Sequence, residues 1–371
     1  NDLLAVDEVL KSDYLTTGPK VKEFEDKIAK YVNAKYAVSF SNGTAALHGA
    51  CYAAGVGVGD EVITTPITFA ASANCALYMG GTPVFADINE ENFNIDVNEI
   101  KNKITDKTKA IIPVDYTGQA VDIDSIKELT KGTDIVIIED GAHSLGTKYK
   151  GTLVGGLADM TMFSFHPVKT ITTGEGGIIT TNNEEHYRKL MNFRTHGITR
   201  EQEQLVNKDM GSWYYEQLDL GYNYRMTDIQ AVLGISQLDK IDYFIEKRKK
   251  IVKRYNEAFK ETEGIILHKN EDYSDTVNHL YVIKLDLPKL KAGRNEIFNA
   301  LLAENIGVNV HYIPVYLHPY YQKLGYKKGL CPKAEELYDA IITIPLFPAM
   351  AIEDVEDVIN GVNKIINYYR K

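Results

Sequence analysis

The sequence predicts an α/β fold with a mostly parallel sheet, followed by a smaller α+β unit. Short β-branched runs alternate with helix-sized gaps from residue 36 to 182, and a long helical pattern follows from 227 to 260. The 371 residues correspond to about two domains. We expect a large domain of residues 1–245, which begins with a helix, and a small C-terminal domain of residues 246–371.

The strands expected in the sheet are continuous apolar runs, as in parallel sheets that helices cover on both faces. They are YAVSF (36–40), EVITTP (61–66), PVFADI (83–88), AIIPVDY (110–116), DIVIIED (134–140), MTMFSF (160–165) and GGIITTNN (176–183). Ligands of such sheets bind beyond the carboxyl ends of the strands. Asp87, Asp115 and Asp140 fall at or beside strand ends, so three acids compete for a role there.

The C-terminal part begins with the helical pattern of 227–260, which predicts a long helix that is broken at most once. The segments HLYVIKLDL, RNEIFNALLAENI and VNVHYIPVY, with a final helical segment, are expected to form the smaller α+β unit. Residues 198–217 are polar and contain a WYY cluster, which favours a mobile loop over a core element.

The composition narrows the function classes. The formal charge of −10 argues against non-specific electrostatic binding to nucleic acid or to an anionic membrane. Cys51, Cys75 and Cys331 are too scattered for a disulfide framework or a metal site, so we expect buried free thiols and no metal. The chain opens without a signal-type leader, from which we expect a cytoplasmic protein.

The segment SNGTAALH (41–48) follows one expected strand and opens a helical segment. Free N–H groups and the helix dipole at such a start favour a phosphate near Asn42, Gly43 and Thr44, although an ordinary N-cap explains the residues equally well. The segment lacks the endings of a P-loop and of a dinucleotide-binding loop. The phosphate would therefore belong to a molecule other than the nucleotides that those two loops bind.

The segment IIEDGAHSLG places Asp140 at the end of the most apolar strand, with His143 three residues later. A buried carboxylate needs a partner such as a protonated ring nitrogen, but Asp140 could also cap the turn that follows the strand. Lys169, in FSFHPVKTITTGEGG, follows an apolar approach that would favour its neutral amine. A neutral amine can form a Schiff base with an aldehyde, although a lone lysine can equally be a solvated loop residue.

These three features occur in the order that pyridoxal phosphate requires: a phosphate held, a pyridine nitrogen paired and an aldehyde bound. Seven segments also resemble the sugar-nucleotide aminotransferases of the DegT type, a fold-type I family that depends on pyridoxal phosphate. They are SNGTAAL, TPITFAASANC, PVFADI, EDGAHSLGTKYKG, FSFHPVKTITTGEGG, NFRTHG and LGYNYRMTDIQA. The resemblance runs from about residue 7 to the C-terminus and is most specific in residues 163–177.

The resemblance assigns the cofactor contacts. It implies that Lys169 bonds the cofactor covalently and that Asp140 pairs with its ring nitrogen. Gly43, Thr44 and Ser164 would hold the phosphate, Phe69 would stack on the ring, and His143 and His166 would flank it.

The resemblance also assigns a substrate pocket. Asn223 and Arg225 would reach the active site of a partner subunit, which makes a homodimer with shared active sites the smallest functional unit. For Arg225 a surface salt bridge remains the simpler alternative. The nucleotide-sugar pocket would be lined by Leu15, Thr16, His311, Tyr312 and Pro314.

The activity that the resemblance implies is amino transfer from glutamate to the C4 ketone of UDP-2-acetamido-2,6-dideoxy-β-L-arabino-hex-4-ulose, a step of pseudaminic acid biosynthesis. The alternatives are another 3- or 4-aminotransferase of the family, acting on a different nucleotide sugar, and a non-catalytic sugar-nucleotide-binding protein. The family dehydratases replace the lysine, and a non-catalytic protein would have lost Lys169 or Asp140. Both residues are present.

Overall fold

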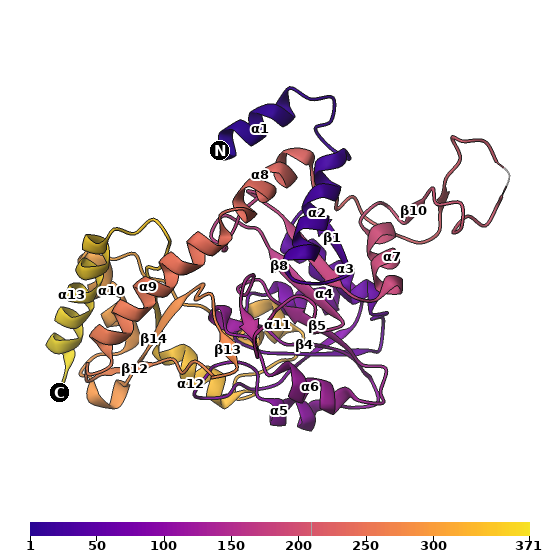
Figure 1. The fold of residues 1–371 in the computed structure, drawn as a ribbon. Helices are drawn as coiled ribbons and strands as arrows, with labels where there is room; N and C mark the ends of the chain where they lie inside the picture. Colours follow the sequence, from indigo (N-terminus) through magenta and orange to yellow (C-terminus); the bar gives the residue numbers. More distant parts are fainter. Residues whose placement is uncertain (209) are drawn as a thin grey trace.

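The large sheet has seven strands in the order β1-β9-β8-β5-β4-β2-β3, as described by a computed structural model of residues 1–208 and 210–371 (Figure 1). All seven expected strands are present. β9 runs antiparallel to both of its neighbours, and the other pairings are parallel, so the mostly parallel sheet is confirmed. The strands are β1 (Tyr36–Phe40), β2 (Glu61–Thr64), β3 (Thr82–Phe85), β4 (Thr108–Ile112), β5 (Val136–Asp140), β8 (Met160–Ser164) and β9 (Gly177–Thr181).

Helices cover both faces of this sheet, which explains why its strands are apolar throughout. Along β4, Ile111 packs in one core and its neighbours Ala110 and Ile112 pack in the other. The first core includes side chains of α2 (Pro19–Tyr31), α5 (Val97–Lys103), α6 (Ile123–Thr130) and α8 (Asp228–Leu238). The second includes side chains of α3 (Gly43–Ala53), α4 (Ala71–Tyr78) and α7 (Glu184–Phe193).

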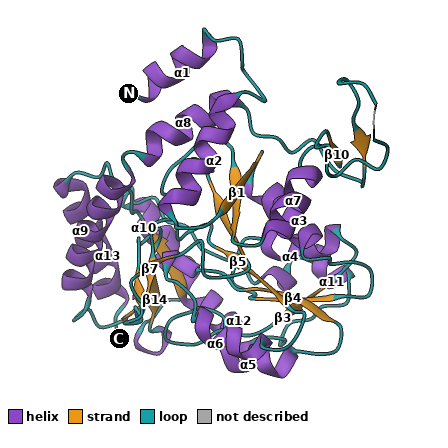
Figure 2. Cartoon of the chain, turned by 45° about the vertical axis from the view of Figure 1, so that its right-hand side comes forward, coloured by secondary structure: helices purple, strands orange, loops and turns teal. Residues whose placement is uncertain are grey.

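The helical pattern of residues 227–260 forms two helices, α8 and α9 (Ile241–Phe259), so the pattern is broken once, within the expected limit of at most one break. Thr227 caps α8 in a capping box with Gln230. α1 (Asp2–Leu10) lies beside α8, and the two helices are seen together in Figures 1 and 2. The expected domain boundary at residue 245 falls inside α9, and the division into two domains stays a prediction.

The C-terminal part contains an antiparallel three-stranded sheet of β12 (Ile265–Leu267), β14 (Tyr281–Leu285) and β15 (Ile341–Ile344). α9, α10 (Arg294–Ala303) and α13 (Ile352–Tyr369) pack with it in a third core. The segment VNVHYIPVY contributes no regular strand here, since only Asn309 forms a bridge, to Thr343. The remaining helices of this part are α11 (Pro319–Lys323) and α12 (Pro332–Ala340).

The polar segment expected to be a loop projects from the body of the molecule in Figure 1. It is closed by a short ribbon of β10 (Ile198–Thr199) and β11 (Glu216–Gln217), so a core element is excluded, while its mobility stays a prediction. A second small sheet joins β6 (Lys148–Tyr149) to β7 (Thr152–Leu153) and β13 (Ser274–Asp275). In the described residues, no helix is long and apolar enough to cross a membrane.

Candidate active site

A cavity of about 900 Å³ opens at the carboxyl ends of the large sheet, and we call it the strand-end cavity. It collects residues that are far apart in the sequence, from the start of α3 to the segment around Tyr312. Eleven of the residues singled out from the sequence line it: Asn42, Gly43, Thr44, Phe69, Asp140, His143, Ser164, His166, Lys169, His311 and Tyr312.

Lys169 lies in the connection between β8 and β9, where its backbone N–H donates to the carbonyl of His166 at 2.9 Å. Burial lowers the pKa of its amine to about 8, and the negative charge of Asp140 opposes part of this shift. A pKa near 8 leaves a useful fraction of neutral, nucleophilic amine at physiological pH. Lys169 is half-buried and lines the cavity, which favours the first of its two interpretations, and its role stays a prediction.

Asp140 ends β5 and is 4% exposed. Its Oδ2 accepts a hydrogen bond from Ser72 Oγ at 2.6 Å, and its Oδ1 accepts one from the N–H of Ala142 at 3.1 Å. Burial raises the pKa of the carboxyl, while these two donors and the charge of Lys169 act in the opposite direction. The carboxylate is fixed in place and can pair with a cationic ring nitrogen in the cavity.

The other two strand-end acids are used for structure. Asp87 accepts hydrogen bonds from the N–H groups of Lys333 and Ala334, at the start of α12. Asp115 is fully buried and accepts from the N–H of Val121 and from Ser144 Oγ. Among these three aspartates, only Asp140 lines the strand-end cavity. Asp140 is therefore the one that can contact a ligand there.

The start of α3 forms one end of the cavity. Asn42 is an N-cap whose Oδ1 accepts from the N–H of Ala45 at 2.8 Å. The amides of Gly43 and Thr44 precede the first intrahelical hydrogen bonds, and no protein acceptor for them is found among the described residues. A Cβ on Gly43 would come within 3.3 Å of Ser164 Cβ, so glycine keeps this corner open. The N-cap interpretation is confirmed, and the binding of a phosphate at these amides stays a prediction.

Two histidines lie beside Tyr312 on the cavity wall. His143 is buried and its Nε2 hydrogen-bonds the hydroxyl of Tyr312 at 3.2 Å. Burial and the charge of Lys169 lower the pKa of His143 well below its usual range, so the ring is neutral at pH 7. His311 Nδ1 bonds Thr343 Oγ1 at 2.9 Å, and burial lowers its pKa to about 4. Neither ring supplies a positive charge to the cavity.

Five further residues proposed from the resemblance do not line the cavity of this chain. Leu15 and Thr16 contact the start of α8 through the backbone of Asp228 and Thr227. Their roles stay predictions, as do those of the other three: Asn223, Arg225 and Pro314.

Sequence reasoning missed several residues that line the cavity, among them Ser72, Thr68, Tyr78 and Tyr224. Thr68 Oγ1 and Ser72 Oγ lie 2.8 Å apart, and Ser72 carries the bond to Asp140. Their spacing of four residues, just before and within a helix, was the available signal. It is weak, because the partner of Ser72 is 68 residues away in the chain.

The comparisons with known proteins agree with this geometry. A transaminase of Campylobacter jejuni (serotype O:23/36, strain 81-176), named UDP-4-amino-4,6-dideoxy-N-acetyl-beta-L-altrosamine transaminase, is 38% identical over 100% of this chain and 96% of its own length. Helicobacter pylori PseC, an aminotransferase involved in the biosynthesis of pseudoaminic acid, superposes with a TM-score of 0.91 and 34% identity, covering 99% of this chain and 96% of its own.

Spr1654 of Streptococcus pneumoniae, in its PMP form, superposes with a TM-score of 0.92 and 34% identity over 99% of this chain and 96% of its own, and a PLP form of that protein matches similarly. The expected fold class is confirmed by these neighbours. The family model of the DegT/DnrJ/EryC1/StrS aminotransferase family matches residues 1–363. With a match over almost its whole length, the chain belongs to the DegT/DnrJ/EryC1/StrS aminotransferase family.

Proposed function

We propose that this enzyme transfers the amino group of glutamate to the C4 ketone of UDP-2-acetamido-2,6-dideoxy-β-L-arabino-hex-4-ulose, with pyridoxal phosphate as its cofactor. The main support for the proposal is that Lys169, Asp140 and the start of α3 all line one cavity. Support for the sugar comes from the relative named as an altrosamine transaminase. The cytoplasmic location stays a prediction.

The residues present fit this cofactor. The amides of Gly43 and Thr44, which have no protein acceptor among the described residues, and Ser164 beside them offer donors to a phosphate at a helix start. Asp140 offers a fixed carboxylate to a ring nitrogen, and Lys169 offers an amine to an aldehyde. Bound pyridoxal phosphate supplies the carbonyl carbon that takes up the amino nitrogen and the ring that accepts electrons from the reacting carbon.

Lys169 acts as the base and then as the acid. Its Nζ takes the proton from Cα of glutamate in the first half-reaction, which releases 2-oxoglutarate, and delivers a proton to C4 of the sugar in the second. Asp140 holds a proton on the ring nitrogen through both halves, because its carboxylate is fixed by Ser72 and Ala142. Phe69 is 64% exposed at the mouth of the cavity and offers a flat face to a ring.

The functional unit that we propose is a homodimer. In the described residues, Lys169 is the one Lys or Arg side chain that lines the strand-end cavity, although the proposed substrate carries a diphosphate. A guanidinium from a second subunit would supply the missing charge, and Arg225 is the residue proposed for this. Mixing inactive Lys169→Ala subunits with Arg225→Ala subunits should restore turnover in the mixed dimers. No recovery would contradict a shared site.

The experiment that tests the function follows the visible spectrum of the holoenzyme. Glutamate should bleach the band of the bound cofactor, and the UDP-linked 4-keto sugar should restore it while mass spectrometry detects a 4-amino sugar. Bleaching without recovery would discard this sugar and favour the alternative, another 3- or 4-aminotransferase of the family. If no band forms with added pyridoxal phosphate, the role of Lys169 is wrong.

A further inference from the structure

A second cavity, of about 480 Å³, lies along α9 and shares no lining residue with the strand-end cavity. We call it the α9 cavity. It is an open groove on the surface, and its volume falls within the range of about 300–1,000 Å³ that is usual for small-molecule sites. It is lined by Lys249, Val252, Lys253, Asn256, Glu257, Lys260, Leu267, His268, Asn270 and Asn278.

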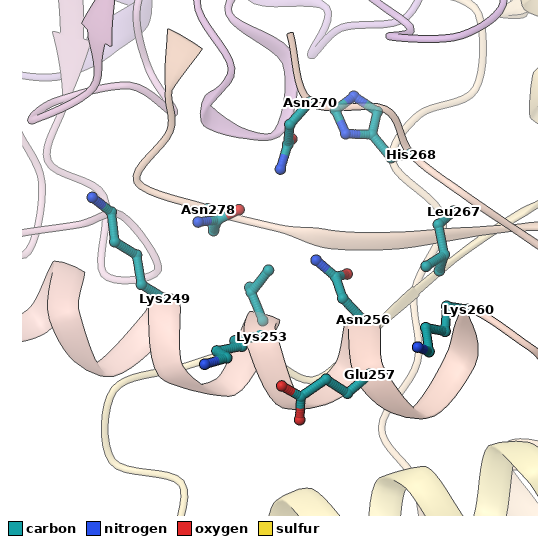
Figure 3. Close-up of a pocket in the computed structure, with 10 residues that line it drawn as sticks. Lys249, Lys253, Asn256, Glu257, Lys260, Leu267, His268, Asn270 and Asn278 are labelled. Atoms are coloured by element: carbon teal, nitrogen blue, oxygen red, sulfur yellow. The ribbon is translucent and has the colours of Figure 1, made fainter. Parts of the chain in front are cut away.

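The wall of the α9 cavity is rich in carboxamides. Figure 3 shows Asn256 on α9 facing Asn270 and Asn278 across the gap. The Oδ1 of Asn256 accepts from the hydroxyl of Tyr281 at 2.7 Å, which leaves its NH₂ group free to donate. Asn278 donates through Nδ2 to the carbonyl of Thr276 at 3.1 Å, which leaves its Oδ1 free to accept. Donors and acceptors of this kind suit hydroxyl groups.

The rim of the cavity carries a row of lysines. Lys249 and Lys253 lie on α9 and Lys260 is its C-cap residue, and their spacings of four and seven residues place them on one side of the helix (Figure 3). Lys249 Nζ is paired with Asp275 Oδ1 at 2.7 Å. For Lys253 and Lys260, no ion pair is found within residues 1–208 and 210–371. Two cations are thus uncommitted, in a chain whose formal charge is −10.

We propose that the α9 cavity binds a small sugar phosphate. Lys253 and Lys260 would attract the phosphate, and the carboxamides of Asn256 and Asn278 would bind the hydroxyl groups. Glu257 is the one carboxylate among the lining residues and opposes the phosphate charge. The proposal does not depend on the sugar that the enzyme aminates.

Titration calorimetry of the holoenzyme with ribose 5-phosphate tests this site. We expect one ligand per chain, and affinity weaker by about tenfold or more in the double variant Lys253→Ala/Lys260→Ala. Lys250→Ala is the matched control, because Lys250 is on the same helix and does not line the cavity, and it should leave the affinity unchanged. Equal affinity in the wild type and the double variant would overturn the proposal.

Two more variants test separately how the phosphate and the sugar hydroxyl groups of the ligand are bound. Glu257→Gln should tighten binding a few-fold, because it removes a like charge without removing side-chain volume. Asn256→Ala should weaken ribose 5-phosphate more than inorganic pyrophosphate, since pyrophosphate has no sugar hydroxyl groups. If pyrophosphate binds as tightly as ribose 5-phosphate and Asn256→Ala affects neither, the sugar part of the proposal is wrong.

Discussion

The strand-end cavity and the α9 cavity use charge in opposite ways. In the first, Asp140 and His143 are buried and Lys169 is half-buried, and burial displaces the pKa of each. In the second, Lys253 on α9 and Lys260 directly after it are exposed to solvent. A desolvated group changes its reactivity, whereas a solvated one only attracts. The comparison places chemistry in the first cavity and, at most, reversible binding in the second.

The largest effect that this comparison predicts is for Lys169→Ala. Removal of the amine should lower turnover by at least about 10³-fold, because no other lining residue in the described part of the chain can carry the proton as an amine. Turnover is measured with the keto sugar and glutamate, and folding by thermal unfolding. Lys150→Ala, which breaks a surface ion pair with Asp124, should keep full activity. Retained turnover in Lys169→Ala would contradict the assignment of the chemistry to the strand-end cavity.

Next in size is Asp140→Asn, compared with Asp115→Asn. The amide at 140 cannot hold the ring proton, so we expect turnover to fall by about 10²-fold or more. Asp115 does not line the strand-end cavity, and burial raises the pKa of its carboxyl well above its usual range, so an amide of the same shape should change turnover little. Similar losses in both variants would show that the two acids act as one unit.

The same acids show how far the sequence could lead. Motif and strand order placed Asp140, Lys169 and Gly43 at one sheet edge, because parallel strands bring their carboxyl ends together. The sequence could not decide among Asp87, Asp115 and Asp140, since that choice depends on α12 and on Ser144. Ser72 was missed because its bond to Asp140 spans 68 residues. β15 was missed as well, since it is a short strand directly after α12.

A smaller, graded effect is expected from pH. Because burial lowers the pKa of Lys169 to about 8, the neutral amine is the minor form below that pH and the major form above it. The rate at which the apoenzyme captures pyridoxal phosphate should therefore rise by about tenfold per pH unit below 8 and level off above it. Stopped-flow absorbance measures this rate. A rise that continues to pH 10 would show that Lys169 is solvated like the lysines of α9.

The smallest change in turnover is expected for Ser72→Ala. This variant tests whether the hydrogen bond from Ser72 to the Asp140 carboxylate contributes to turnover. Loss of the 2.6 Å donor should raise the pKa of Asp140 further and weaken its hold on the ring proton, so turnover should fall several-fold, and more at pH 6 than at pH 8. Ser125→Ala is the matched control, because Ser125 Oγ also donates to an aspartate, Asp122, at 2.6 Å, in a half-buried position outside the strand-end cavity. If the two variants have the same pH profile, the hydrogen bond from Ser72 does not influence the protonation of Asp140.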